Sequence, residues 1–199
     1  MDENIQEITE ATPEAEQSQS TEISNDFYVV SNVKFITLFI CTFGVYPIYW
    51  FYKNWQLQKA ISGESCWPIM RGIFYIFFTH NLFRRIDKKL VANRKEHSWD
   101  FENIATFVVV LTLSANILNR LSGKNIGSPF TDIAGLILVL VVGALLLNVQ
   151  KAINIACNDP EGKSNDRFTP LNYVWITLGT ILIIFIFIGL FFTQDAPVY

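Results

Sequence analysis

The stretch from Phe168 to Gln194 contains no Asp, Glu, Lys or Arg, and it includes an unbroken apolar run from Ile181 to Ile188. A helix needs about 20 mostly apolar residues to cross the hydrocarbon core of a bilayer, which is about 30 Å thick. This stretch is long enough, so it predicts a membrane-spanning helix. It therefore places the chain among all-α integral membrane proteins built as a helical bundle.

Charged residues make up 17% of the chain, whereas about 25% is usual in soluble domains. Their distribution is uneven, because the first 26 residues contain Asp and Glu but no Lys or Arg. Such an acidic, polar segment cannot bury enough apolar surface to fold. We therefore expect a disordered N-terminal tail over residues 1–26 and a helical membrane domain over residues 27–194.

Four segments are predicted to span the bilayer, because each is apolar and nearly free of charge. They are residues 33–52, 103–119, 131–150 and 171–193. The first contains Gly44 and Pro47, which favour a kink within a crossing helix. A re-entrant hairpin that breaks between these two residues is the alternative.

Residues 67–83 hold an apolar part that is too short to cross, bracketed by Arg71 and His80. We expect an interfacial or re-entrant helix there, with full crossing as the alternative. Phe83, Ile86 and Leu90 then recur at helical spacing among basic residues, which predicts a basic amphipathic helix over residues 83–95. Its candidate contacts to anionic lipid are Arg84, Arg85, Lys88, Lys89, Arg94 and Lys95.

The same basic residues predict the orientation, because loops rich in Lys and Arg stay in the cytoplasm. Residues 84–95 should then be cytoplasmic and the C-terminus outside. If residues 67–83 do not cross, the N-terminal tail is outside as well, and this option fits the rule better. If they do cross, the tail is cytoplasmic.

Polar side chains inside spanning helices usually face the bundle interior. Four asparagines are candidates for helix packing or for lining a pore: Asn116, Asn119, Asn148 and Asn154. Asparagine can hydrogen-bond across helices, so helix packing is favoured over a solute path. A second group, the candidate aromatic belt at the membrane interface, comprises Tyr46, Tyr49, Trp50, Tyr52 and Trp55.

No motif for chemistry is found. Gly162-Lys163-Ser164 lacks the first glycine of a phosphate-binding loop, and His80 and His97 lack partners at metal-ligand spacing. We therefore predict no catalytic residue, no cofactor and no metal. Nucleic-acid binding is not predicted either, because the aromatic row from Tyr46 to Trp55 has no basic groove beside it.

The segment from Gly44 to Trp55, which ends Tyr-Trp-Phe-Tyr-Lys-Asn-Trp, resembles a family of small bacterial multi-pass membrane proteins of unknown function. Residues 67–83 and the stretch from Val149 to Asn172 are similar to that family too. The resemblance implies localisation in the bacterial inner membrane and implies no activity.

The predicted function is that of a non-enzymatic accessory or scaffold subunit. Its expected partners are the lipid bilayer, anionic on the cytoplasmic side, and another membrane protein or a second copy of the chain. The alternative is a small transporter or channel subunit that uses the asparagine-bearing faces.

Overall fold

The computed structural model describes the backbone of residues 22–193, with side chains up to residue 185 and at residue 188. This part of the chain is helical and contains no strand, which confirms the all-α class for it. Its elements are α1 (Asn32–Cys41), α2 (Tyr46–Ser62), α3 (Pro68–Ile73), α4 (Tyr75–Ala92), α5 (Phe101–Ser122), α6 (Phe130–Ala156), the 3-10 helix η2 (Lys163–Asn165) and α7 (Pro170–Thr193).

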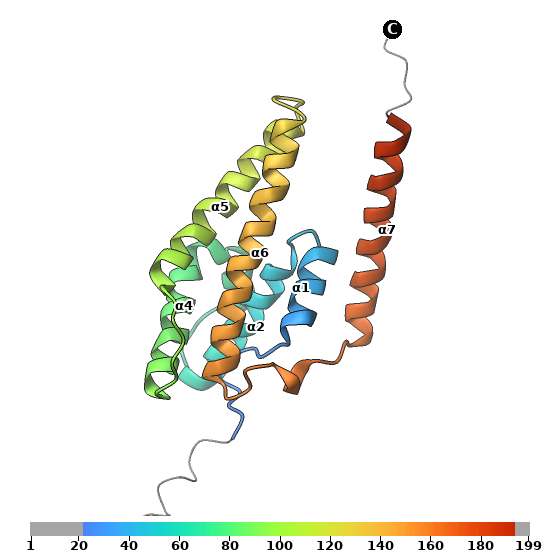
Figure 1. Cartoon of the computed structure of the whole chain (residues 1–199). Helices are drawn as coiled ribbons and strands as arrows, with labels where there is room; N and C mark the ends of the chain where they lie inside the picture. The colour runs from blue at the N-terminus through green and yellow to red at the C-terminus, as the bar shows by residue number, and fades with distance from the viewer. Residues whose placement is uncertain (1–21, 194–199) are drawn as a thin grey trace, which may run out of the picture.

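The helices α5 and α6 form an antiparallel hairpin and rise beyond α1 and α2 (Figure 1). Both are long and apolar enough to cross a membrane. The Asp100 side chain caps α5 by accepting a hydrogen bond from the Asn103 N–H at 3.0 Å. At the far end, Ser128 donates to the Asp132 carboxylate at 2.5 Å and so closes the turn between the two helices.

The predicted single span over residues 33–52 is wrong, because the chain turns back between α1 and α2 (Figure 1). Phe43 and Gly44 adopt φ values of 50° and 79°, which end the first helix. Pro47 then lies in the first turn of α2, where its missing N–H costs nothing. The structure thus has the hairpin that was the alternative. With 10 residues, α1 is only about 15 Å long.

The predicted boundary at residue 83 is also wrong, because Tyr75 to Ala92 form one continuous helix, α4. The only break in this region is at Phe74, between α3 and α4. The apolar face of α4 is buried in the protein core through Leu82, Phe83, Ile86 and Leu90. That face therefore does not rest in lipid headgroups as predicted.

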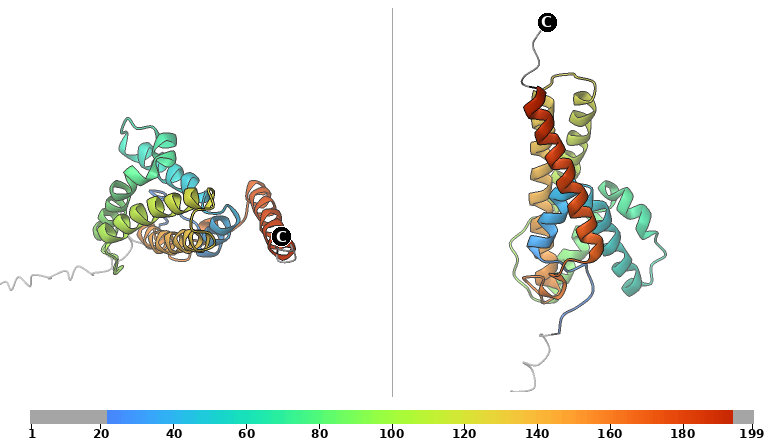
Figure 2. Two further views of the ribbon diagram at one scale, coloured as in Figure 1. Left: turned by 90° about the horizontal axis from the view of Figure 1, so that it is seen from above. Right: turned by 90° about the vertical axis from the view of Figure 1, so that its right-hand side faces the viewer.

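The last helix, α7, stands to one side of the other helices (Figures 1 and 2). It occupies the span predicted over residues 171–193, and its part from Pro170 to Phe185 is apolar. Its neighbour is α1, which it crosses where Gly179 meets the Cys41 backbone. A Cβ atom at position 179 would overlap the Cys41 carbonyl oxygen, so only glycine allows this approach.

The core lies where α1, α2, α4 and the lower half of α6 meet. Its largest fully buried apolar side chains are Phe35, Leu38, Trp50, Phe51, Trp55, Leu82, Phe83, Ile86, Leu146 and Ile153. The tail predicted to be disordered over residues 1–26 needs correction for residues 22–26. Ser24 N–H donates to the Cys157 carbonyl at 3.1 Å, and Asp26 forms an ion pair with Lys89. Residues 1–21 of the predicted tail lie outside the described residues, as does residue 194, the last residue of the predicted membrane domain.

Candidate functional site

A buried network of amide side chains surrounds the non-helical segment 27–31, which runs between α2 and α6. Asn54 Oδ1 accepts from the Tyr28 N–H at 3.0 Å, and Gln150 Nε2 donates to the Tyr28 carbonyl at 3.2 Å. Asn154 bonds both backbone groups of Val30, at 3.4 and 3.0 Å. Buried backbone outside a helix needs such partners, so these amides make the segment part of the core.

The network also joins α2 to α6. Trp50 Nε1 donates to Gln150 Oε1 at 2.5 Å, and Gln150 Nε2 donates to Asn154 Oδ1 at 2.7 Å. Gln150, Asn154 and Asn54 are all fully buried. Asn154 is thus a packing residue, and its partner is the segment before α1.

The four candidate asparagines do not gather at one place. Asn148 is half-buried near the lower end of α6, close in sequence to Asn154. Asn116 and Asn119 are exposed on α5, and Asn116 Nδ2 donates to the Thr112 carbonyl of its own helix at 2.8 Å. Asn116 and Asn119 line a cavity of about 380 Å³ that also touches the two helix breaks at Gly44 and Phe74.

The six candidate basic residues divide between ion pairs and free surface. Arg85 forms a two-pronged ion pair with Glu64, at 2.7 and 2.8 Å, and Lys89 pairs with Asp26. Among the described residues, none forms an ion pair or a side-chain hydrogen bond with Arg84, Lys88 or Arg94, which are exposed. Lys95 is half-buried. Three of the six therefore remain fully available to an anionic surface.

The aromatic belt prediction needs correction for three of its five residues. Tyr46, Trp50 and Trp55 are buried in the core, at 5%, 0% and 0% exposure. Phe35 of α1 packs edge-on against both Tyr46 and Trp50. Of the five, Tyr49 is exposed and Tyr52 half-buried. Tyr and Trp are common both at interfaces and in cores, so composition alone did not separate the two roles.

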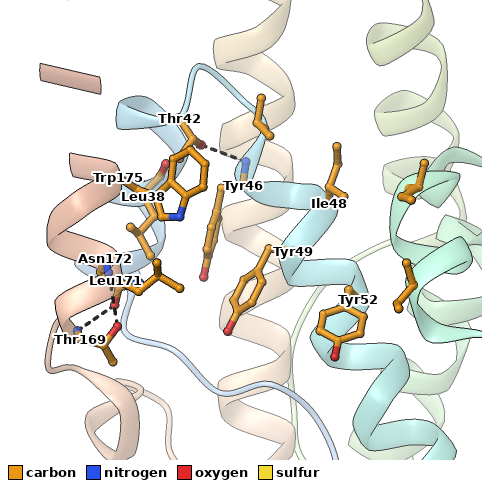
Figure 3. A pocket seen from close by; sticks show the side chains of 13 residues that line it. Leu38, Thr42, Tyr46, Ile48, Tyr49, Tyr52, Thr169, Leu171, Asn172 and Trp175 are labelled. Atoms are coloured by element: carbon orange, nitrogen blue, oxygen red, sulfur yellow. Dashed lines mark hydrogen bonds between the residues drawn. The ribbon is translucent and has the colours of Figure 1, made fainter. Parts of the chain in front are cut away.

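A pocket of about 400 Å³ lies between α2, α1 and the first turns of α7 (Figure 3). We call it the wedge pocket. Tyr46, Tyr49 and Tyr52 follow one another down its α2 wall, with successive ring centroids 6.1 and 6.3 Å apart. Their hydroxyls point toward the end of the molecule at which α7 begins (Figure 3). Leu171 and Trp175 supply the α7 wall.

The α7 wall was missed as part of a site, because nothing in the sequence indicates that residues 169–175 face residues 46–52. The residues at this place indicate only that a helix begins here. Asn172 Oδ1 accepts from the Thr169 N–H at 3.0 Å, and Pro170 occupies the first turn. The wedge pocket is mainly apolar with a few hydroxyl and amide groups. This composition suits an apolar ligand oriented by a polar end.

The loop before α7 is held by two buried charged groups. Lys34 of α1, 1% exposed, donates to Asn165 Oδ1 and to the Arg167 carbonyl, both at 2.6 Å. Asp159 accepts from the Lys163 and Ser164 N–H groups at 2.9 and 2.8 Å. Burial alone would raise the pKa of Asp159, but the hydrogen bonds from Ser164, Lys163 and Gly162 hold it below its ordinary value.

Within the described residues, no group of His, Cys, Asp and Glu side chains is arranged to hold a metal ion. The comparisons with family models, with curated proteins and with solved structures found no match.

Proposed function

We propose that this chain is a non-enzymatic integral membrane protein that acts as an accessory or scaffold subunit. In this proposal α5, α6 and α7 cross the bilayer. The α1–α2 and α3–α4 pairs enter from one side, turn at Gly44 and Phe74, and return to the same side.

The observation that carries the proposal is the apolar surface of the long helices. α5 exposes Phe107, Val110, Leu113 and Ile117, and α6 exposes Leu136, Ile137 and Leu140, while α7 exposes Val174, Leu178, Ile181 and Leu182. Soluble monomers rarely leave so much contiguous apolar surface in water. Lipid, another membrane protein or a second copy of the chain would cover it.

The charges support one orientation. Arg84, Lys88 and Arg94 are exposed on and just after α4, whose last turns lie at the end opposite the α5–α6 turn (Figure 1). By the positive-inside rule this end faces the cytoplasm. A bacterial inner membrane, implied by the family resemblance, belongs to the same proposal.

A second candidate function is that of a small transporter or channel subunit, which the cavity beside α5 favours. Thr112, Asn116 and Asn119 face the two helix breaks across it. Broken helices also surround solute sites near the bilayer midplane in secondary transporters. The scaffold function is preferred because the remaining candidates, Asn148 and Asn154, lie elsewhere on α6.

The test uses single cysteines placed in the full chain at Val110 and Leu140, with Cys41, Cys66 and Cys157 changed to Ala. We expect both sites to react with a lipid-soluble maleimide and to resist a charged, water-soluble one. A cysteine at Lys88 is the matched control and should show the reverse. Ready labelling of Val110 and Leu140 from water would overturn the membrane proposal.

The two function classes separate in a second measurement. If the chain is a scaffold, a photoreactive residue at Leu136 should cross-link to a partner membrane protein. Cells that lack the chain should then lose that partner from the membrane. Changing Asn116 and Asn119 together to Leu should leave that protein in place. Loss of solute flux in reconstituted vesicles on the same double change would instead favour the transporter.

A further inference from the structure

The wedge pocket exists because α7 meets the rest of the molecule at one crossing. Gly179 brings α7 against the Cys41 backbone near the top of α1. Beside this crossing, residues of α1, α2, α3 and the first turns of α7 enclose the pocket of about 400 Å³ (Figure 3). The wedge pocket therefore lies beside α7, which in the proposed function crosses the bilayer.

The wall of the pocket suits a hydrocarbon chain. Four helices contribute apolar side chains to it: Leu38 of α1, Ile48 of α2, Ile73 of α3 and Leu171 of α7. The tyrosine rings add flat apolar surface, and their hydroxyls lie toward the end where α7 begins. The volume falls within the range of small-molecule sites in proteins. A ligand with an apolar body and a polar end toward that side would match this lining.

Basic residues follow or precede two of the pocket-lining residues closely in the sequence. Lys53 follows Tyr52 directly on α2, and Arg167, exposed, precedes the pocket residue Thr169 by two positions. Lys34 holds the Arg167 carbonyl at 2.6 Å, which fixes this backbone beside α1. Asp166 precedes Arg167, and Asp159 and Glu161 lie earlier in the same loop. Two basic residues therefore lie within two positions of residues that line the pocket.

We infer that the wedge pocket binds one acyl chain of an anionic phospholipid, with the headgroup phosphate toward Lys53 and Arg167. This inference rests on the proposed membrane function and adds a specific lipid site to it. The lipid would fill the space between α7 and α2 and so hold the last helix in place.

The test uses the full chain in phosphatidylcholine vesicles with a trace of phosphatidylglycerol that carries a diazirine in its acyl chain. After illumination, mass spectrometry should find the label mainly on peptides that contain Ile48–Tyr52 or Leu171–Trp175. Unlabelled phosphatidylglycerol should displace it, and added phosphatidylcholine should not. The inference would be overturned if these peptides were labelled no more strongly than the α5 peptide that contains Val110 and Leu113.

Two variant pairs sharpen the test. Lys53→Gln with Arg167→Gln should weaken competition by phosphatidylglycerol about fivefold per charge removed, whereas Arg120→Gln with Lys124→Gln, at the opposite end, should not. Leu171→Trp should fill the pocket and abolish labelling of the wedge pocket, whereas Leu113→Trp, at an exposed position on α5, should not. Equal effects within either pair would also overturn the lipid site.

Failure of the lipid site differs from failure of the proposed function. If the α5 peptides are labelled but the wedge is not, the chain is membrane-embedded without this site. If neither is labelled, the membrane proposal itself falls.

Discussion

Asn154 is the residue on which the non-helical segment before α1 depends most. It bonds both the N–H and the carbonyl of Val30 and accepts from Gln150. Asn154→Leu would remove the partners of the buried Val30 N–H and carbonyl, and each such loss costs about 1–3 kcal/mol. We expect a clear fall in the unfolding midpoint of the detergent-solubilised chain.

The matched control is Asn116→Leu, since Asn116 is also an asparagine on a long helix but is exposed and bonds only its own helix. Its effect should stay below about 0.5 kcal/mol, as for most surface substitutions. If both changes shift the midpoint equally, the amide network contributes nothing special to stability.

Asp159 provides a pH-dependent prediction at the same scale. Its pKa is lowered from 3.8 in the folded chain, because N–H groups of the loop bind the carboxylate more strongly than burial opposes it. A carboxyl group whose pKa is lowered by folding stabilises the fold at pH values above its unfolded-state pKa. This stability is lost as the pH falls through the folded-state pKa.

Asp159→Asn should therefore lower the unfolding midpoint at pH 7, and the difference from the parent chain should shrink as the pH falls below 3.8. Asp166→Asn, at an exposed position in the same loop, is the control and should change little at either pH. A difference that is constant from pH 7 to pH 3 would contradict the role given to the carboxylate.

Among the helices, those with the longest apolar stretches were predicted well. Residues 103–119 and 131–150 lie inside α5 and α6, because nothing in these stretches interrupts the helical pattern. The region from residue 33 to residue 95 was predicted less well. Whether Gly44 kinks a helix or reverses it depends on what packs around the turn, and sequence periodicity does not show this.

Single residues show the same limit. The apolar face of α4 around Phe83 has the pattern of a helix lying on a membrane, yet it packs against Phe51 and Trp99. Similarly, a packing role was expected for Asn154, but its partner Val30 lies 124 residues away along the chain. The wedge pocket was missed for this reason too, because it joins α2 to residues from the start of α7.

The crossing of α7 over α1 gives a prediction about one element. Gly179→Val would force α7 away from the Cys41 carbonyl oxygen, because a side chain does not fit there. We expect α7 to lose protection from hydrogen exchange while α5 and α6 keep theirs. Gly123→Ala is the control, since a Cβ there makes an ordinary contact at 3.4 Å with the Asn119 carbonyl oxygen. Unchanged exchange in α7 would mean that this crossing does not hold the helix.

For the whole molecule, the hairpin of α1 and α2 changes the expected side of the N-terminus. A crossing helix over residues 33–52 favoured an N-terminal tail outside the cell. The structure instead pairs Asp26 with Lys89, so the chain enters the fold at the basic end of α4. In the proposed membrane function, both then lie on the cytoplasmic side.

Reporter fusions test this arrangement in living cells. A fusion before Met1 and one within Lys88–Lys95 should both report the cytoplasm, because the α1–α2 and α3–α4 pairs each return to the side they enter. Fusions in the turn after Ser122 and after Tyr199 should report the outside, since α5 and α7 each cross once in the same direction. The fusion before Met1 is the decisive one. An outside signal there, with the other three as expected, would mean that α1 and α2 cross the bilayer as one span after all.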